Sequence, residues 1–273
     1  MYKRQEQGGE TKAYPIQLLG YHHQVRDTVG GVAVMVTYCI VCRTGRVYSP
    51  AVDGKLEEFR LVGMDHFNAM FEDKTTKSWW RQATGEAIAG PKKGSRLEEI
   101  PSQQTTLKEW LQLHPQSLVL QADKKFEKEY GKLKGYDIGE INSTLIGSSK
   151  SSWEDKSWVI GIEAEGIAAA YDWNALKEKR IIQDTVGNLN IALVIGDDGQ
   201  SFFSWNRNLN GEVLNFNSDT LNLFADDKTH SRWNAAGICV SGDMTGSKLK
   251  HEQSYQEFWH SWQSFHPQTR KVE

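Results

Sequence analysis

The chain has 273 residues, enough for two domains of ordinary size, and its 38% hydrophobic and 25% charged residues are typical of a folded protein. The net charge is -3, so the chain lacks the excess of basic residues that contacts with nucleic-acid phosphates require, and we expect no nucleic-acid partner. The sequence has no apolar run of about 18 residues, and we expect the chain as given to be soluble. Three cysteines are too few for a disulfide scaffold.

The first predicted element is a β-hairpin. Residues 24–28 and 32–38 are rich in β-branched side chains and flank Gly30-Gly31, a pair typical of a two-residue hairpin turn. If the hairpin closes on this turn, the positions of paired residues sum to 61, which puts Cys39 opposite His22. Their β-carbons would then lie about 5 Å apart.

A second hairpin turn is predicted at Asp53-Gly54, because both residues accept the positive φ angles of a type I′ turn. A short helix is predicted further on. Thr106 to Glu109 has the pattern of a capping box, the following apolar residues have helical spacing, and Pro115 ends the run. The polar stretch from Gln121 to Asp155 comes next, and we interpret it as a linker.

The second half of the chain repeats the first. Asp27 to Gly30 recurs as Asp184 to Gly187, a shift of 157 residues, and His114 to Gln116 recurs as His266 to Gln268, a shift of 152 residues. The second hairpin turn has a counterpart at Asn210-Gly211. We expect the second terminal helix to begin with a capping box over residues 254–257.

The repeat predicts two domains, residues 1–120 and residues 156–273, joined by a linker of residues 121–155. Each is expected to be a mainly antiparallel α+β fold, sandwich-like or barrel-like, that ends in a helix. The second copy opens with the apolar run from Trp158 to Ile162, whereas the residues before Gly9 are polar. We therefore expect the first copy to lack its opening strand and an upstream segment to be missing.

The chemistry is expected in the first copy, around Cys39 and Cys42. The imidazole of His22 and the cation of Arg43 would lower the pKa of a neighbouring thiol and favour the thiolate, which attacks disulfides and binds soft metals. The second copy lacks the set, because Lys179, Gly196 and Gly199 stand where the first copy has His22, Cys39 and Cys42. The site is therefore assigned to the first copy alone.

Residues that both copies keep are interpreted as framework. Trp80 matches Trp233, and Gly85 matches Gly237. Cys239 has no cysteine partner in the repeat, and we expect it to be an inert buried thiol.

Three functions are compatible with the cysteine pair. The first is a thiol/disulfide redox module in which Cys39 attacks, Cys42 resolves and His22 tunes the thiolate. The alternative is a protein that binds copper or zinc through Cys39, Cys42, His22 and His66. The third is a non-catalytic interaction scaffold in which the cysteines are idle.

The sequence also resembles the domain of unknown function 3179 family, which is largely bacterial. The resemblance rests on residues 22–27 with 29–31, 36–42, 78–82 and 84–91, that is, all of the first copy and, more weakly, the second. Some members of that family are selenoproteins with selenocysteine in the CxxC motif, so the resemblance implies redox chemistry at Cys39 and Cys42. Relatives often carry N-terminal membrane segments, which implies a membrane-anchored or exported bacterial domain attached through an upstream segment.

Four further residues, in or beside these stretches, are candidates for binding: Asp27, Tyr38, Arg43 and Gln82. Arg43 stands where the family commonly has glycine, which leaves the specificity open. The expected partner is a small-molecule or protein thiol or disulfide.

Overall fold

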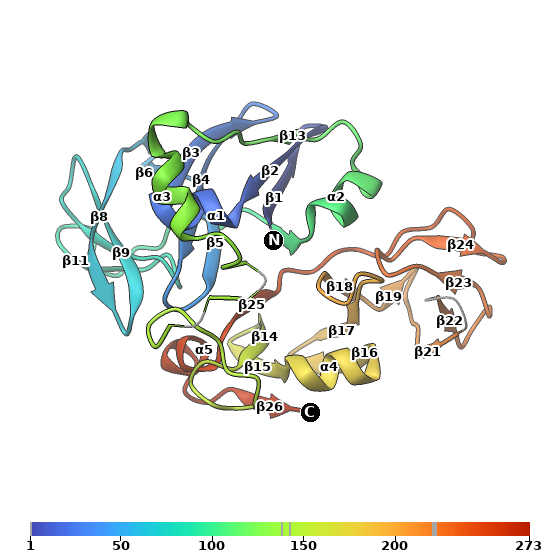
Figure 1. The fold of residues 1–273 in the computed structure, drawn as a ribbon. Coiled ribbons are helices and arrows are strands. Elements are labelled where there is room, and N and C mark those ends of the chain that lie inside the picture. Colours follow the sequence, from blue (N-terminus) through green and yellow to red (C-terminus); the bar gives the residue numbers. More distant parts are fainter. Residues whose placement is uncertain (1, 138, 142, 220–222) are drawn as a thin grey trace. The chain divides into compact units, whose positions relative to one another are not determined.

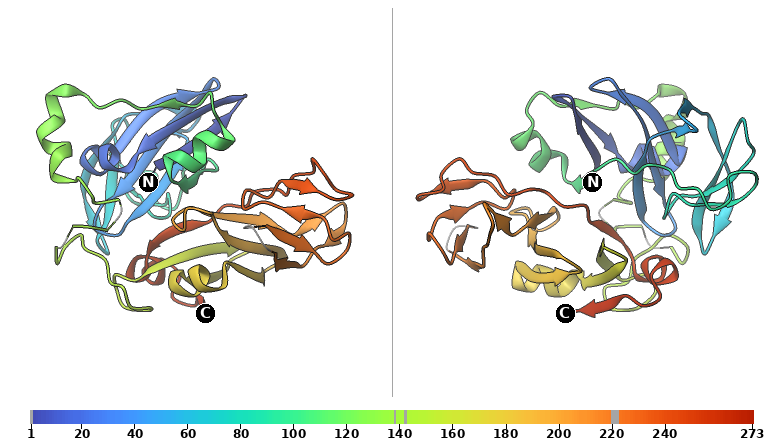
Figure 2. Two further views of the ribbon diagram at one scale, coloured as in Figure 1. Left: turned by 45° about the vertical axis from the view of Figure 1, so that its right-hand side comes forward. Right: turned by 180° about the vertical axis from the view of Figure 1, so that it is seen from behind.

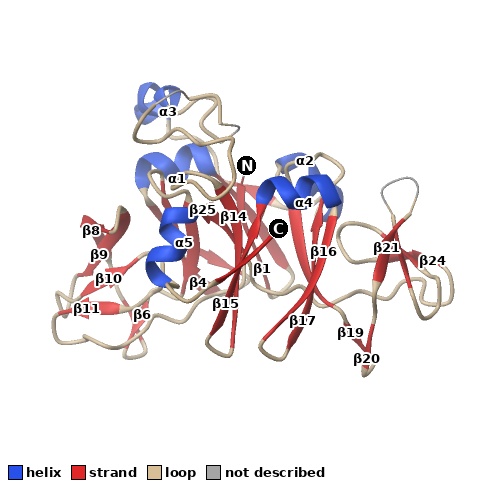
Figure 3. Ribbon diagram, turned by 90° about the horizontal axis from the view of Figure 1, so that it is seen from below, coloured by secondary structure: helices blue, strands red, loops and turns tan. Residues whose placement is uncertain are grey.

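The computed structural model describes residues 2–137, 139–141, 143–219 and 223–273. Strands dominate and the helices are few and short (Figure 3), which confirms the mainly antiparallel α+β class. No sheet within the described residues closes into a barrel. The chain divides into two compact units, each made of two separate segments: unit 1 is Met1–Trp158 with Tyr255–Pro267, and unit 2 is Val159–Ser254 with Gln268–Glu273.

Unit 1 contains the elements of the first half of the chain and one strand and one helix from its end (Figure 1). Its strands are β1 (Tyr2–Gln7), β2 (Glu10–Pro15), β3 (Gln24–Val29), β4 (Val32–Cys39), β5 (Thr44–Tyr48), β6 (Ala51–Val52), β7 (Lys55–Leu56), β8 (Phe59–Asp65), β9 (Asn68–Asp73), β10 (Trp79–Arg81), β11 (Ala87–Ala89), β12 (Gln103–Thr105), β13 (Leu118–Val119) and β25 (Tyr255–Phe258). Its helices are α1 (Ile16–His22), α2 (Leu107–Leu113), the 3-10 helix η1 (Lys124–Phe126), α3 (Glu127–Lys132) and α5 (Trp259–Phe265).

Four sheets build unit 1 from these strands, in the orders β12-β1-β2-β13, β3-β4-β5, β6-β7 and β11-β10-β9-β8. Within these four sheets, every pairing between described strands is antiparallel except that of β13 with β2. The sheet β3-β4-β5 carries Cys39 at the end of β4, and its two faces pack into different hydrophobic clusters, one with Met35 and Cys39, the other with Val34 and Val36. The alternation along β4 therefore places Cys39 inside the core.

Among its described residues, unit 2 consists of short strands and the helix α4. Its elements are β14 (Trp158–Ala164), β15 (Ile167–Asp172), α4 (Trp173–Lys179), β16 (Ile181–Val186), β17 (Leu189–Ile195), β18 (Phe202–Asn206), β19 (Asn208–Leu209), β20 (Glu212–Val213), β21 (Phe216–Ser218), β22 (Phe224–Asp226), β23 (Arg232–Trp233), β24 (Cys239–Ser241) and β26 (Arg270–Val272). Its sheets join β14, β15 and β26, then β16-β17-β18, β19-β20 and β21-β22-β23-β24.

The predicted hairpin register is confirmed. Gln24 pairs with Thr37 and Val29 with Val32, so the paired positions sum to 61. Gly30 and Gly31 have φ angles of 53° and 82°, a conformation that glycine adopts without steric cost. The turns at Asp53-Gly54 and Asn210-Gly211 also have positive φ at both residues, as predicted.

The expectation that the first copy lacks its opening strand was wrong. Residues before Gly9 form β1, which pairs with β2 from Tyr2↔Pro15 to Gln7↔Glu10. Their polar sequence concealed the strand, because apolar residues were the signal on which the expectation depended.

The stretch interpreted as a linker packs on unit 1. Tyr136 is fully buried, Leu133 is buried, and both belong to the cluster of Val34 and Val36. Helix α3 (green) also packs beside α1 (blue) (Figures 1 and 2). Residues of this stretch therefore complete the core of unit 1.

The two terminal helices begin differently. In α2, the Thr106 side chain accepts a hydrogen bond from the Glu109 N–H, as the predicted capping box requires. The capping box predicted over residues 254–257 was wrong, because Tyr255–Phe258 is the strand β25 and Phe258 precedes α5 without a side-chain cap. Main-chain carbonyls take the place of a side-chain cap, because the N–H groups of Trp259 and His260 donate to the carbonyl oxygens of Ser157 and Asp155.

Several contacts occur in both units at matching positions. Tyr14 donates a hydrogen bond to Asp27 (2.9 Å) and Tyr171 donates one to Asp184 (2.7 Å). Trp80 and Trp233 are buried, and each indole N–H donates to an aspartate, Asp73 and Asp226 respectively, at 2.9 Å. These contacts favour the internal repeat, which stays a prediction, and they give the matched tryptophans a framework role.

Candidate functional site

Cys39 and Cys42 lie at the connection between β4 and β5. Cys39 is the last residue of β4 and pairs with Thr44, so the chain reverses through residues 40–43. Both cysteines are free thiols, and they are 3% and 0% exposed. The turn closes with Arg43 at a φ of 60°, a conformation uncommon for residues other than glycine.

Arg43 is buried and binds protein groups. Its guanidinium lies 3.5 Å from the ring centre of Tyr136 and donates hydrogen bonds to the carbonyl oxygens of Tyr136 (2.6 Å) and Ile146 (3.2 Å). The Tyr136 hydroxyl in turn donates to the Ile40 carbonyl at 2.6 Å. Arg43, predicted to bind a ligand, therefore fixes the cysteine turn against the segment that follows α3.

The turn from β8 to β9 covers both sulfur atoms. Cys39 Sγ lies 3.3 Å from the carbonyl oxygen of Phe67, and Cys42 Sγ lies 3.9 Å from that of His66. His66 and Phe67 have φ angles of 49° and 64°. Two consecutive left-handed residues other than glycine store strain of about 1–3 kcal/mol each, a feature that clusters at functional sites.

An imidazole from the far end of the chain contacts the second cysteine. His260, on α5, places Nε2 at 3.3 Å from Cys42 Sγ. Its Nδ1 lies 2.8 Å from the Asp155 carbonyl oxygen, which can only accept. Nδ1 therefore carries a proton, and in the neutral ring the lone pair of Nε2 faces the thiol.

A buried polar network holds α5 in this position. Arg46 Nη2 and Glu257 Oε1 form an ion pair at 2.5 Å with side chains 3% and 1% exposed. Ser261 donates to Glu257 Oε2 at 2.5 Å and accepts from Asn68 Nδ2 at 3.1 Å. Thr44 donates to Asn68 Oδ1 at 2.5 Å, so the network joins β5, β9, β25 and α5 beneath the thiols.

The two thiols differ in acidity. The hydrogen bond from the Cys42 thiol, helped by the N–H groups of Val41, Cys42 and Ala69, lowers the pKa of Cys39 to about 7 against the opposing effect of burial. The same hydrogen bond and burial raise the pKa of Cys42. Cys39 is therefore the thiol that ionises first, and when it is protonated it donates to the Phe67 carbonyl.

The expected pair of His22 with Cys39 is not formed. His22 is the last residue of α1, and β3 begins only at Gln24, so the register is right but the strand does not reach His22. The His22 ring bonds the Tyr130 hydroxyl at 2.7 Å and contacts Phe126, while burial lowers its pKa. The short helix between β2 and β3 had no signal in the sequence that we recognised.

The other predicted residues mostly support the fold. Asp27 accepts hydrogen bonds from Tyr14 and Lys12, and the Gln82 amide donates to Thr37 Oγ1 and the Thr44 carbonyl, directly under the cysteine turn.

Tyr38 is buried edge-on against Tyr136, and burial raises its pKa to about 12. Cys239 is 2% exposed, as expected for a buried thiol.

The four predicted metal ligands do not converge. The His66 ring is exposed and pairs with Asp65 at 2.8 Å, and only its main-chain carbonyl approaches a cysteine. Across the part of the chain that the structure describes, no group of three or more His, Cys, Asp or Glu side chains has a metal-binding arrangement.

The sequence did not point to His260, Ser261 and Glu257, because both paired cysteines lie in the first copy and the site was expected there alone. At the shift of 152 residues they stand where the first copy has Lys108, Glu109 and Thr105. The site in the first half was expected at residues that the second copy lacks. The same comparison, applied to the second half, would have included His260.

Comparison with known proteins gives a family and no activity. Residues 5–269 match the family described as "Protein of unknown function (DUF3179)", as one domain that spans both halves. No curated protein and no solved structure matches the chain significantly. Among the described residues, no helix has the length and apolar character needed to cross a membrane. The chain belongs to the DUF3179 family.

Proposed function

We propose that the chain is a thiol/disulfide redox protein whose reactive pair is Cys39 and Cys42. The observation that carries the proposal is the contact of 3.3 Å between Cys42 Sγ and the unprotonated Nε2 of His260. It gives the pair a base for the second thiol, while Cys42 itself supplies the hydrogen bond that acidifies the first. A structural pair of buried cysteines needs neither arrangement.

The reaction uses both contacts in turn. The Cys39 thiolate attacks one sulfur of a substrate disulfide, which forms a mixed disulfide and releases one substrate thiolate. Cys39 is then no longer charged, so the Cys42 thiol turns to His260 Nε2 and transfers its proton there. The Cys42 thiolate attacks Cys39 Sγ and releases the second substrate thiolate. Two electrons pass to the substrate and a Cys39–Cys42 disulfide remains.

Access requires movement of the turn of His66 and Phe67, because both thiols are buried beneath its carbonyl groups. The strained φ angles of these residues favour such a movement. Phe67 and Met64 beside it are 60% and 61% exposed, which offers an apolar surface to the substrate next to the thiols.

His260→Asn tests the assigned base. Ellman's reagent reports each step separately, because attack by Cys39 releases one coloured thiolate and resolution by Cys42 releases a second. We expect H260N to leave the first release unchanged and to slow the second about a hundredfold at neutral pH, the usual contribution of a general base.

His230→Asn is the matched control, since His230 is an exposed turn residue with φ 55° in unit 2, a conformation that asparagine tolerates. It should leave both steps unchanged. Equal second-step rates in H260N and in the wild-type protein would overturn the role of His260, and the absence of any second release in the wild-type protein would overturn the redox proposal itself.

A further inference from the structure

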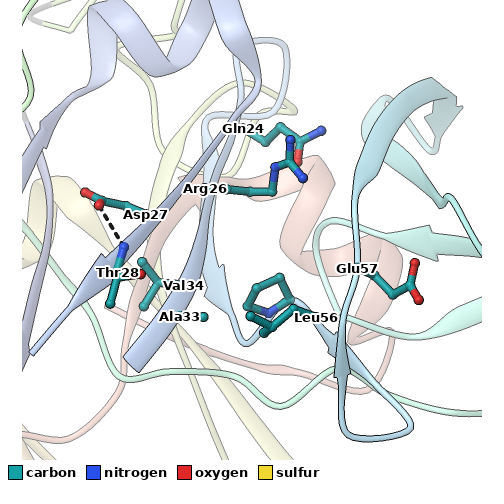
Figure 4. Close-up of a pocket in the computed structure, with 9 residues that line it drawn as sticks. Gln24, Arg26, Asp27, Thr28, Ala33, Val34, Leu56 and Glu57 are labelled. Atoms are coloured by element: carbon teal, nitrogen blue, oxygen red, sulfur yellow. Dashed lines mark hydrogen bonds between the residues drawn. The ribbon is translucent and has the colours of Figure 1, made fainter. Parts of the chain in front are cut away.

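A cavity of about 600 Å³ lies along the outer part of the β3–β4 hairpin. Figure 4 shows Gln24 and Arg26 on β3, Val34 on β4, and Leu56 and Glu57 at the end of β7 around this space. Its size is that of pockets that hold small molecules or short peptides. Neither the two cysteines nor the residues that contact their sulfur atoms line this cavity.

Two opposite charges in its wall have no partner. The side chains of Arg26 and Glu57 make no ion pair or hydrogen bond with any residue that the structure describes, and both line the cavity together with Leu56 (Figure 4). The other charged residue in the wall, Asp27, is already bound by Lys12 and Tyr14. The cavity therefore offers a cation and a carboxylate without described partners, beside the apolar side chains of Val34, Pro50 and Leu56.

A buried acceptor is also left over. Gln24 Nε2 donates to the Phe59 carbonyl at 2.6 Å, which fixes the orientation of the amide. Gln24 Oε1 is buried and has no hydrogen-bond partner. Buried polar groups in native proteins are nearly always paired, so this acceptor on a residue of the cavity wall can take a hydrogen bond from a water or from a bound molecule.

The same positions in unit 2 lack these groups. At the shift of 157 residues, Gln24, Arg26 and Glu57 correspond to Ile181, Gln183 and Leu214. Gln183 has both amide atoms satisfied by the main chain of Phe216, the counterpart of Phe59, at 2.8 and 2.9 Å. The fold therefore does not need the charges, and their presence in the first half calls for another cause.

We infer that this cavity binds a short peptide in its zwitterionic form. The C-terminal carboxylate pairs with Arg26, a backbone N–H donates to Gln24 Oε1, and the amino end is directed to Glu57. Small apolar side chains would lie on Val34, Pro50 and Leu56. Charge-assisted contacts at both ends give the site its selectivity for molecules that carry both charges.

Trialanine, its C-terminal amide and its N-acetyl form test the inference, since the blocked forms each lose one charge without any change in the protein. We expect titration calorimetry at low salt to detect trialanine and to show each blocked form binding about tenfold more weakly. Arg26→Gln should lower the affinity for trialanine by a similar factor and leave the affinity for its C-terminal amide unchanged. Glu57→Gln should likewise lower the affinity for trialanine and leave the affinity for the N-acetyl form unchanged.

Arg60→Gln is the control, because Arg60 is 70% exposed, pairs with Glu72 and lies outside the cavity wall. It should bind trialanine like the wild-type protein. The inference is overturned if trialanine does not bind, if the blocked peptides bind as well as trialanine, or if R26Q and R60Q give equal affinities. These results are independent of the thiol reaction.

Discussion

At the scale of single residues, the two cysteines are made different by what each sulfur contacts. Cys39 accepts hydrogen bonds from Cys42 and from main-chain N–H groups, which lowers its pKa to about 7. Cys42 faces His260 Nε2. Its pKa is raised by its hydrogen bond to Cys39, by burial and by the negative charges of Cys39 and Glu257. One buried pair thus contains a nucleophile and a protonated resolving thiol at neutral pH.

Cys42→Ala removes the largest of the effects that acidify Cys39. A thiolate that loses a hydrogen bond becomes less stable, so the pKa of Cys39 should rise from about 7 towards or above 8.5, the ordinary value for a thiol. The alkylation rate of Cys39 against pH measures it, with Cys239→Ala as the control that keeps the wild-type profile. An unchanged profile in C42A would show that the Cys42 thiol does not acidify Cys39.

Residue types identified the cysteine pair in the sequence, but they could not identify its base. Cys39 and Cys42 are close in sequence, whereas His260 is separated from Cys42 by 218 residues. Only the position of α5 brings it to the thiol. His22 was chosen because the extrapolated strand reached it, but His22 is the last residue of the helix α1.

At the scale of elements, the turn between β8 and β9 is built from residues that disfavour it. Asp65 pairs with Asn68, so His66 and Phe67 form a two-residue hairpin turn in which asparagine and glycine would be the usual choice. The strain is retained where the turn covers the thiols, which favours a functional cause.

Replacing both residues, as His66→Asn with Phe67→Gly, should relieve the strain. We expect the free energy of unfolding to increase by about 1–2 kcal/mol, measured by urea denaturation of the reduced protein. If the turn must open for reaction, attack by Cys39 should also become slower. Gly54→Ala is the converse control, because Gly54 has φ 75° and open space around its missing Cβ. This substitution should lower the free energy of unfolding by about 1 kcal/mol. A lower free energy of unfolding in the double variant would contradict the claim that His66 and Phe67 are strained.

Turn chemistry predicted the elements better than hydrophobic pattern did. Gly30-Gly31 fixed the register of β3 and β4, and Asp53-Gly54 fixed that of β6 and β7, because these turns depend on the residues within them. Strand β1 and strand β25 were missed because tertiary pairing, which the local sequence does not record, decides their structure.

At the scale of the whole molecule, unit 1 is completed by residues from the far end of the chain. Tyr255–Pro267 returns to it after the long segment Val159–Ser254 of unit 2, and the Phe258 N–H donates to the Cys42 carbonyl at 3.0 Å. The predicted division into residues 1–120 and 156–273 did not include this return. The site therefore depends on both halves of the chain.

Truncation after Ser254 should open the site. It removes β25 and α5 from unit 1, so Cys42, which is 0% exposed in the full chain, should become alkylated rapidly without denaturant. Truncation after Pro267 is the matched control, because it removes only residues of unit 2 and should leave Cys42 protected. Equal protection of Cys42 in the two truncated chains would contradict the assignment of the terminal segment to unit 1.

The measurement that tests the redox claim most directly is the thiol state of the full chain across a series of glutathione potentials, read by alkylation and intact mass, with and without a chelator. Cys239 is the internal reference. We predict that Cys39 and Cys42 change together as one two-electron couple at a potential that the chelator does not alter. If the pair stays reduced at every potential, or resists alkylation until a chelator is added, the claim is contradicted, and the second result would assign the pair to metal binding.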